Sequence, residues 1–264
     1  MSNIGTQHFY SLAEIVEHID DIYKYRNSFV FRGQADKEWL IESTLTRSLK
    51  KSYPDQINDH NLIEMYLNNF KSNIRGRTEI DLVNIADDDI WSLGQHFGLY
   101  TPLIDWTYSP YIGLFFALQG ESKSGIRVVH SISLEEVQEI NKHCPMDKKL
   151  KIIEPLHHSN ERLVNQRGLF LKTPTDFDIV KWILKYGKGI NSEYVGMISF
   201  TFSDELTQEL KFSLEQMNIN ESTLFPDLMG AAKYSNYLFD TKPIKNKIVE
   251  RQHNSVTKNK KTKK

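Results

Sequence analysis

Hydrophobic and polar positions repeat with two different periods along the chain, and these periods predict helices and strands in mixed order. Apolar residues at helical spacing mark five segments: 12–22, 62–70, 87–97, 179–186 and 204–217. Apolar runs typical of short buried strands mark four others: 28–31, 126–132, 169–171 and 194–202. Because these elements follow one another without a regular strand–helix–strand rhythm, the pattern predicts an α+β fold with a mixed, irregular sheet flanked by helices.

Capping signals mark three of the predicted helix starts. Ser11 precedes Glu14 by three residues, and Ser133 precedes Glu136 by the same interval, which is the spacing of a capping box. Ser109-Pro110 places a capping hydroxyl before a proline, the residue favoured at the first helical position. This dipeptide therefore predicts a further helix over residues 111–118.

The body of the chain contains no linker rich in Gly, Pro or Ser, so we expect a single globular domain over residues 1–240. Residues 241–264 differ from that body in charge, because they carry nine Lys or Arg and one acid, Glu250. The rest of the chain carries 24 basic and 33 acidic residues, a net charge of −9. Such a tail is typical of a frayed, solvated terminus; the alternative is a basic arm that binds RNA, DNA or an acidic partner.

Composition narrows the class of protein. Residues of the hydrophobic class make up 39% of the chain, enough for a sizeable core. The single cysteine, Cys144, cannot form an internal disulfide, which favours a reducing compartment, and it leaves too little sulfur for a structural zinc site. The N-terminus lacks a basic start followed by an apolar run, and the longest apolar stretch, 111–118, is far too short to cross a membrane. We therefore expect a cytoplasmic protein with no membrane partner and no metal.

Phe31-Arg32-Gly33-Gln34 places a guanidinium group at the end of a predicted buried strand. An arginine there suits a phosphate or a carboxylate, because its planar fork can donate two parallel hydrogen bonds. The glycine that follows would allow a ligand to approach the backbone closely. The alternative is an arginine that pairs with an acid and ties down the strand end.

The stretch from Gln95 to Ser109 is the richest in polar chemistry. It combines an amide, the imidazole of His96, the carboxylate of Asp105 and several hydroxyl groups, and it leads into a predicted helix start. In the alternative interpretation, Asp105, Thr107 and Ser109 only satisfy backbone donors and cap the helix. We expect Ser109 to be the cap, and we favour a functional role for His96 and Asp105.

Several blocks of residues occur together along the body of the chain. The first is Phe31-Arg32-Gly33-Gln34 with Trp39, Ser43-Thr44-Leu45 and Arg47; the second is Gln95-His96-Phe97-Gly98, Thr101-Pro102-Leu103, Asp105-Trp106-Thr107 and Ser109-Pro110; the third is Glu161-Arg162, Gln166, Gly168-Leu169-Phe170 and Leu224-Phe225-Pro226-Asp227. Together they resemble the FRG domain family, which is named for its Phe-Arg-Gly motif. One departure is Tyr100-Thr101-Pro102-Leu103, where the family more often has Pro-Thr-Arg-Leu.

A second resemblance rests on the order of an aromatic-Arg-Gly strand end, a Thr-x-Ser before a helix, and an acid before a glycine-aromatic strand. This order is similar to that of ADP-ribosyltransferases, which implies an ADP-ribosyltransferase-like fold and NAD as the substrate. By this resemblance Arg32 would hold the NAD phosphates or ribose, and Thr107 and Ser109 would position the nicotinamide ribose. Glu161, seven residues before Gly168, would be the catalytic glutamate; the alternative is an ordinary surface acid.

Two further residues are expected to take part in the reaction. His96 would be the general acid or base, since an unperturbed imidazole titrates near neutrality, and Asp105 would be a further catalytic carboxylate. A carboxylate suits the reaction because the breaking nicotinamide–ribose bond develops positive charge on the ribose. The remaining residues expected to contact NAD are Gly33, Gln34, Gln95 and Gln166.

The leading hypothesis is therefore an NAD-using ADP-ribosyltransferase-like enzyme. The resemblance implies a toxin or phage-defence effector. Its acceptor would be a nucleic acid or a protein, and a neutralising protein is a candidate partner. Two alternatives remain open. One is a non-catalytic module that recognises a nucleotide, RNA or a partner protein through Arg32, His96 and Asp105. The other is a hydrolase that acts on a nucleotide or on NAD with water as the acceptor.

Overall fold

A computed structural model describes residues 4–23, 28–77, 85–155, 161–188, 190 and 196–241 of the chain. The predicted basic tail lies outside these residues apart from Thr241, so its expected fraying stays a prediction. None of the helices in the described ranges is long and apolar enough to cross a membrane.

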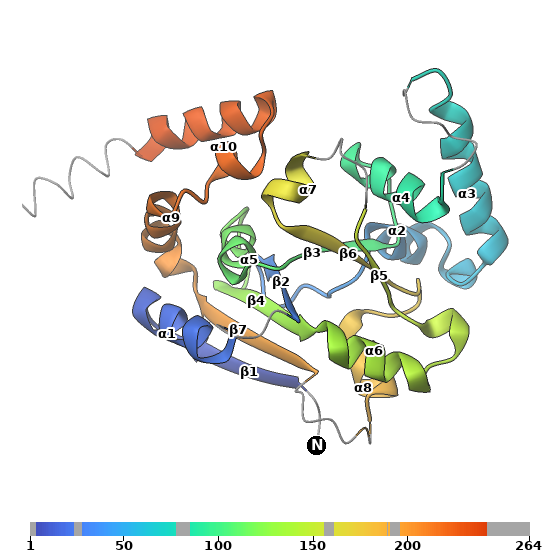
Figure 1. The fold of residues 1–264 in the computed structure, drawn as a ribbon, viewed down its shortest axis with the longest axis horizontal. Coiled ribbons are helices and arrows are strands. Elements are labelled where there is room, and N and C mark those ends of the chain that lie inside the picture. Colours follow the sequence, from blue (N-terminus) through green and yellow to red (C-terminus); the bar gives the residue numbers. More distant parts are fainter. Residues whose placement is uncertain are drawn as a thin grey trace, which may run out of the picture.

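Seven strands of the described chain form one sheet, in the order β1-β7-β4-β2-β3-β6-β5 (Figure 1). The strands are β1 (Ile4–Phe9), β2 (Phe29–Gln34), β3 (Leu103–Thr107), β4 (Ile126–Ser133), β5 (Lys151–Ile153), β6 (Gly168–Lys172) and β7 (Met197–Ser203). The pair β1 and β7 is parallel and the other neighbouring pairs are antiparallel. The expectation of a mixed sheet flanked by helices is therefore confirmed.

Helices cover both faces of this sheet (Figure 1). They are α1 (Leu12–Tyr23), α2 (Thr44–Ser52), α3 (His60–Asn73), α4 (Asp87–His96), α5 (Pro110–Ala117), α6 (Leu134–His143), α7 (Glu161–Asn165), α8 (Ile179–Tyr186), α9 (Thr207–Gln216) and α10 (Glu221–Leu224). A further helix spans 228–241, and short 3₁₀ turns lie at Pro54–Gln56, Met146–Lys148 and Asp204–Leu206.

Three clusters of buried apolar side chains hold these layers together. The first joins α1, α5 and α9 to strands β1, β2, β4 and β7, with Phe31 and Phe200 among its members. The second packs α6 and α8 against the opposite face of the sheet, around Trp182. The third joins α2, α3 and α4 to β3, β5 and β6, with Leu103 and Phe170 among its members. Burial at roughly 25 cal/mol per Å² makes these clusters the main favourable contribution to folding.

Most of the elements predicted from periodicity are present, with boundary differences that have local causes. The helix predicted over 204–217 begins as a 3₁₀ turn, because the Ser203 hydroxyl caps Asp204–Leu206 before α9 starts. The strand predicted over 194–202 is described from Met197. Strand β3 is not among the predicted strands, although Ile104-Asp105-Trp106-Thr107 alternates apolar and polar residues as a half-buried strand does.

Candidate functional site

Strands β2 and β3 are neighbours in the sheet but are paired at one end only. Among the described residues these strands share one paired position, Phe31 with Thr107, whereas β2 pairs with β4 over six positions and β3 with β6 over five. We call the gap between residues 32–34 of β2 and 103–106 of β3 the seam. Directly opposed residues share a face of a sheet, so Phe31 and Thr107 point to the same side. On that side the first and third apolar clusters stand on either flank of the seam.

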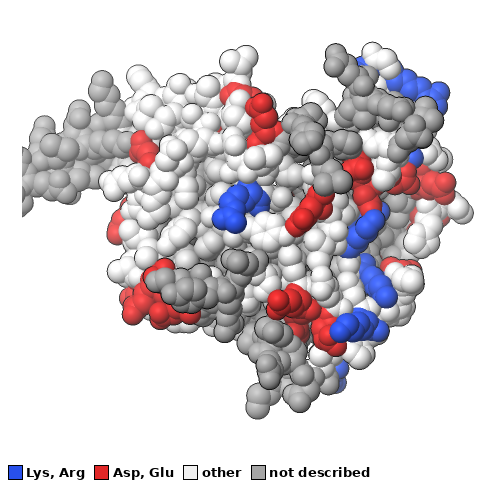
Figure 2. Space-filling model, viewed as in Figure 1, with Lys and Arg blue, Asp and Glu red and all other residues white. Residues whose placement is uncertain are grey.

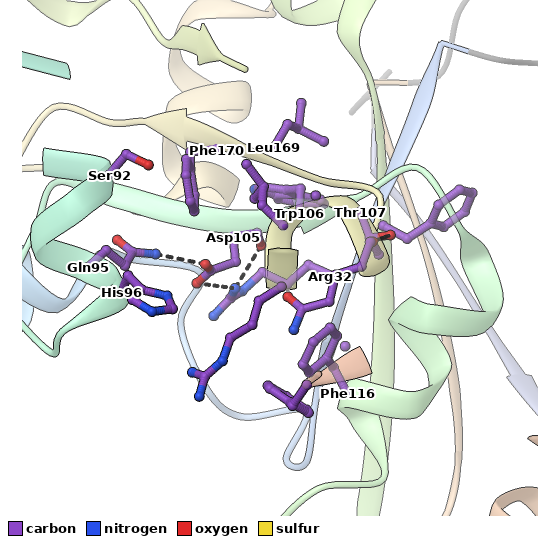
Figure 3. A pocket seen from close by; sticks show the side chains of 17 residues that line it. Arg32, Ser92, Gln95, His96, Asp105, Trp106, Thr107, Phe116, Leu169 and Phe170 are labelled. Carbon is purple, nitrogen blue, oxygen red and sulfur yellow. Dashed lines mark hydrogen bonds and ion pairs between the residues drawn. The ribbon is translucent and has the colours of Figure 1, made fainter. Parts of the chain in front are cut away.

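A cavity of about 350 Å³ opens at the seam (Figure 3). Its polar walls are formed by Arg32, Gln95, His96, Asp105, Thr107, Arg162 and Gln166, and its main apolar walls by Phe31, Trp106, Phe116, Leu163, Phe170 and Phe225. Ligand pockets of proteins typically have volumes of about 300–1,000 Å³ and combine apolar walls with a few converging polar groups. The cavity has this composition. In the face shown in Figure 2, a basic patch lies near the centre, and an acidic patch lies a short way to its right.

Arg32 lies in the seam. Its Nη1 atom donates to the backbone oxygen of Asp105 over 2.8 Å and lies 4.0 Å from the Asp105 carboxylate. The guanidinium therefore occupies part of the space where β2 and β3 have separated. Its Nε atom is buried and has no partner among the described residues, and the same holds for Nε1 of Trp106. Burial lowers the pKa of Arg32, while the negative charge of Asp105 acts in the opposite direction; a guanidinium still stays charged at neutral pH.

Asp105 presents the carboxylate of the cavity wall. The Gln95 side chain donates to it over 2.8 Å, and the Thr101 hydroxyl donates in turn to the Gln95 amide oxygen. The Asp105 side chain is nevertheless 67% exposed, so its oxygens remain accessible to a ligand. Figure 3 shows Gln95 on one side of Asp105 and Arg32 on the other.

His96 follows Gln95 at the end of α4 and lines the same cavity. Burial lowers the pKa of His96, the charge of Arg162 lowers it further, and Asp227 opposes this change. The imidazole is therefore mainly neutral at pH 7, a state in which one ring nitrogen can accept a proton.

Arg162 is a charged cavity residue that was not predicted from the sequence to be in the site, although it belongs to one of the blocks that resemble the FRG family. Its Nε atom donates to the Asp227 carboxylate over 2.6 Å, and its guanidinium lies 5.5 Å from the centre of the Phe225 ring. A planar cation held by an acid and an aromatic face is well oriented, and its remaining N–H groups stay available for a ligand oxygen. The cavity therefore has a second arginine besides Arg32.

Seven of the residues expected in the site line this one cavity: Arg32, Gly33, Gln95, His96, Asp105, Thr107 and Gln166. Three do not. Gln34 is buried and bonded to His130 and to the backbone of Leu40, and Ser109 caps α5 by accepting from the Ile112 N–H. Glu161 is exposed at the start of α7 and is not part of the cavity wall.

The side chains of Thr107 and Gln166 are engaged in structural links. The Thr107 hydroxyl donates to the backbone oxygen of Gln166 over 2.6 Å and accepts from the Ser109 N–H over 3.1 Å. The Gln166 amide donates to the backbone oxygen of Leu224 over 3.0 Å. These bonds tie the end of β3 to the turn before β6 and to the segment that carries Phe225. Both residues therefore shape the cavity even without a ligand.

Gly33 is explained by the packing of α5. A Cβ atom at Gly33 would lie 2.0 Å from the backbone oxygen of Gly113 and 2.2 Å from the backbone nitrogen of Ala117. The sequence had suggested that the missing side chain leaves room for a ligand, but the backbone of α5 fills that space. The glycine allows α5 to lie directly on β2 and to form the wall that carries Phe116.

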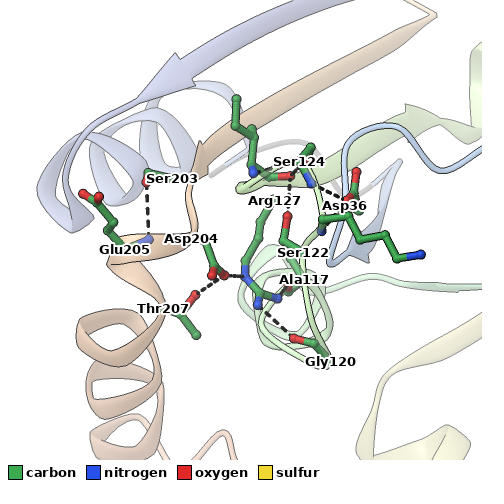
Figure 4. Close-up of polar contacts among 12 residues, drawn as sticks. Asp36, Ala117, Gly120, Ser122, Ser124, Arg127, Ser203, Asp204, Glu205 and Thr207 are labelled. Atoms are coloured by element: carbon green, nitrogen blue, oxygen red, sulfur yellow. Dashed lines mark hydrogen bonds and ion pairs between the residues drawn. The ribbon is translucent and has the colours of Figure 1, made fainter.

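A polar cluster holds the C-terminal end of α5 in this position (Figure 4). Arg127 is buried and donates to the backbone oxygens of Ala117 and Gly120 over 2.7 and 2.9 Å, and to the Asp204 carboxylate over 2.5 Å. Nearby, Asp36 accepts from the backbone N–H groups of Ser124 and Lys123. The loop after α5 is thus anchored through its own carbonyl and N–H groups, which these two buried charges satisfy.

Behind Arg32, a buried histidine makes stability dependent on pH. His130 bonds to Ser199 and Gln34, and burial, with a smaller effect of the Arg32 charge, lowers its pKa to about 3. An unfolded chain has an ordinary histidine pKa of about 6.5, so below that pH the unfolded state binds a proton that the folded state excludes. The free energy of unfolding should then fall by about 1.4 kcal/mol per pH unit, starting near pH 6.5 and continuing down to the folded pKa.

Urea unfolding between pH 7 and pH 4 measures this effect. His130→Gln should show a shallower fall than the wild type, and His143→Gln, which changes an exposed histidine, should match the wild type. His18 contributes in the same direction as His130, because burial lowers its pKa as well. Equal slopes in His130→Gln and the wild type would contradict the assignment.

Comparison with known families gives the site a context. Residues 27–125 match the model of the FRG domain family. The chain carries an FRG domain. No curated protein and no solved structure matches the chain.

The FRG match contains one part of the cavity wall and leaves out the other. Arg32, Gln95, His96 and Asp105 lie inside the matched residues, from β2 to the loop after α5. Arg162, Gln166 and Phe225 come from later segments that fold back onto the FRG domain. The site is therefore complete only when the chain beyond residue 125 is included.

Proposed function

We propose that the FRG domain cavity binds NAD and that the protein transfers its ADP-ribose unit to a nucleic acid or protein acceptor. The observation that supports this function is the convergence of two guanidinium groups, a mainly neutral imidazole and an accessible carboxylate on one cavity. Guanidinium groups suit the pyrophosphate of a dinucleotide, because they donate paired, charge-assisted hydrogen bonds to phosphate oxygens. The aromatic wall residues offer faces for the flat rings of the same ligand.

In the proposed reaction, the bond between ribose C1′ and the nicotinamide nitrogen breaks, and both electrons leave with nicotinamide, which departs neutral. Positive charge develops on the ribose, and the Asp105 carboxylate stabilises it. An acceptor group bearing a proton attacks C1′ and forms the new bond. Its proton passes to the neutral imidazole of His96 and then to solvent. The products are nicotinamide, the ADP-ribosylated acceptor and one proton.

This assignment gives Asp105 the role that the sequence resemblance gave to Glu161. Asp105 lines the cavity beside Arg32, whereas Glu161 does not. The choice between the two carboxylates can be tested directly, because both side chains are exposed and neither substitution removes a buried group.

The test incubates the wild type, Asp105→Asn and Glu161→Gln with cell extract and with NAD labelled in its adenylate phosphate. We expect nicotinamide release and labelled macromolecules with the wild type and with Glu161→Gln. The rate with Asp105→Asn should fall by about 10²–10³, the range found for losing one electrostatic stabiliser of a transition state. The melting temperatures of all three proteins should be nearly equal.

Other outcomes would lead to different functions. Loss of activity in Glu161→Gln with normal activity in Asp105→Asn would return the catalytic role to Glu161. Free ADP-ribose without any labelled macromolecule would indicate an NAD hydrolase. The recognition module has one observation in its favour: Asp105 already accepts from Gln95 and faces Arg32, as a purely positioning residue would. Binding without turnover by the wild type and by Asp105→Asn would establish that module.

A further inference from the structure

An aromatic side chain stands in solvent next to the cavity. Phe97 is 74% exposed, and its ring meets the ring of the cavity residue His96 edge to face, with the centroids 4.8 Å apart. Burying a phenylalanine is worth about 1.5–3 kcal/mol relative to leaving it exposed, so packing within the described fold gives no reason for a phenylalanine here. A single exposed aromatic is not unusual in itself. The evidence for a ligand contact is that the backbone at Phe97 is fixed and that its ring lies beside the cavity.

The backbone at Phe97 is held by a Schellman motif at the end of α4. The Gly98 N–H donates to the backbone oxygen of Gln95 over 3.1 Å, and the Leu99 N–H donates to that of Gly94 over 2.9 Å. Gly98 adopts a φ of +87°, which the motif requires and which favours glycine. Phe97 is therefore the last residue before a closed turn, with little backbone freedom.

The turn is also anchored in the core. A Cβ atom at Gly94 would lie 2.5 Å from the Cδ2 atom of Leu99, so the Leu99 side chain lies directly over that glycine. Leu99 packs in turn against the third apolar cluster. A side chain whose backbone is fixed before binding loses less conformational entropy when a ligand contacts it.

The size of the cavity indicates what Phe97 contacts. At about 350 Å³ the cavity lies near the lower end of the range of about 300–1,000 Å³ found for ligand pockets. NAD contains two nucleotides joined by a pyrophosphate, and the two arginines place that anionic centre inside the cavity. One nucleotide then fills the cavity, and the ring of the other extends past His96 over the rim.

Resting on the proposed function, we propose that Phe97 stacks on the ring of the second nucleotide of NAD. Phe97 is thereby the residue that distinguishes a dinucleotide from a mononucleotide. Stacking of a base on an aromatic side chain needs only a π-face, so the contact requires an accessible, fixed ring and no hydrogen-bond partner.

The test measures affinity by calorimetry with the full chain and three probes: AMP, nicotinamide mononucleotide, and carba-NAD, in which a carbon replaces the ribose ring oxygen so that nicotinamide is not released. Phe97→Ala should weaken carba-NAD binding about tenfold, the effect of losing one stacked base. At least one mononucleotide, the one that fills the cavity, should keep its wild-type affinity. Phe97→Tyr should bind carba-NAD as the wild type does.

A matched control is Phe239→Ala. Phe239 is 80% exposed on the helix over 228–241 and does not line the cavity. The substitution should leave every affinity unchanged. Unchanged carba-NAD binding by Phe97→Ala would overturn the inference, and so would an equal loss for all three probes. If the wild type binds no carba-NAD, the proposed function itself fails and the inference falls with it.

Discussion

Replacing Arg32 by alanine should weaken carba-NAD binding by at least about thirtyfold. Losing the arginine of a buried, hydrogen-bonded arginine–phosphate pair costs about 2–5 kcal/mol. Arg32 is the cationic group that lies in the seam itself, and its Nε atom has no partner among the described residues. The side chain is 22% exposed, so part of its donor capacity is accessible to a ligand phosphate. Calorimetric titration of wild type and Arg32→Ala gives the comparison.

One further variant separates the charge of Arg32 from its geometry, and another is a control. Arg32→Lys keeps the positive charge but loses the planar fork, so it should recover only a small part of the affinity. Arg75→Ala removes an exposed arginine outside the cavity wall and should bind as the wild type does. Near-normal binding by Arg32→Ala with an unchanged melting temperature would show that the arginine only ties the strand end to Asp105.

Replacing Gly33 by alanine should lower the free energy of unfolding by about 3 kcal/mol or more, the upper range for inserting a methyl group into a packed core. The new Cβ atom would meet backbone atoms of Gly113 and Ala117, which cannot move aside as a flexible side chain could. The buried hydrogen bonds of Arg127 hold the same end of α5 in place, so the helix has little room to withdraw. Thermal unfolding should show a drop of about 6–12 °C.

The matched control is Gly5→Ala. A Cβ atom at Gly5, in β1, would have no atom within 4 Å, so this variant should be as stable as the wild type or slightly more stable. A Gly33→Ala protein with wild-type stability would show that α5 can move away from β2. In that case the ligand-access interpretation of the glycine would be the better one.

Local signals predicted the elements well where one residue type determines the structure. Ser109 caps α5 and Pro110 begins it, as the dipeptide predicted, and Ser133 caps α6. The helix over 179–186 was predicted with the bounds of α8, because its apolar residues repeat clearly at helical spacing. The mixed sheet followed from the irregular order of elements. The fold likeness to ADP-ribosyltransferases stays a prediction.

The arrangement of the site depends on tertiary contacts that no local pattern contains. Arg162 enters the cavity because Asp227 and Phe225, more than 60 residues later, hold its guanidinium. Gln34 follows the cavity residues Arg32 and Gly33 in sequence, yet its side chain is taken up by bonds to His130 and to the backbone oxygen of Leu40. The seam itself follows from the separate packing of two apolar clusters, which sequence periodicity does not place relative to one another.

The seam has a consequence for finding the ligand. The two portions of the sheet share one paired position between β2 and β3 among the described residues, and the cavity walls come from both portions. A ligand that contacts both portions binds only the folded state. It therefore raises the free energy of unfolding, by about 2.7 kcal/mol at a concentration of 100 times its dissociation constant. Occupancy is thus thermodynamically linked to unfolding. A bound ligand should raise the melting temperature of the protein. A nucleotide library can therefore be screened by thermal unfolding, without any assay of catalysis.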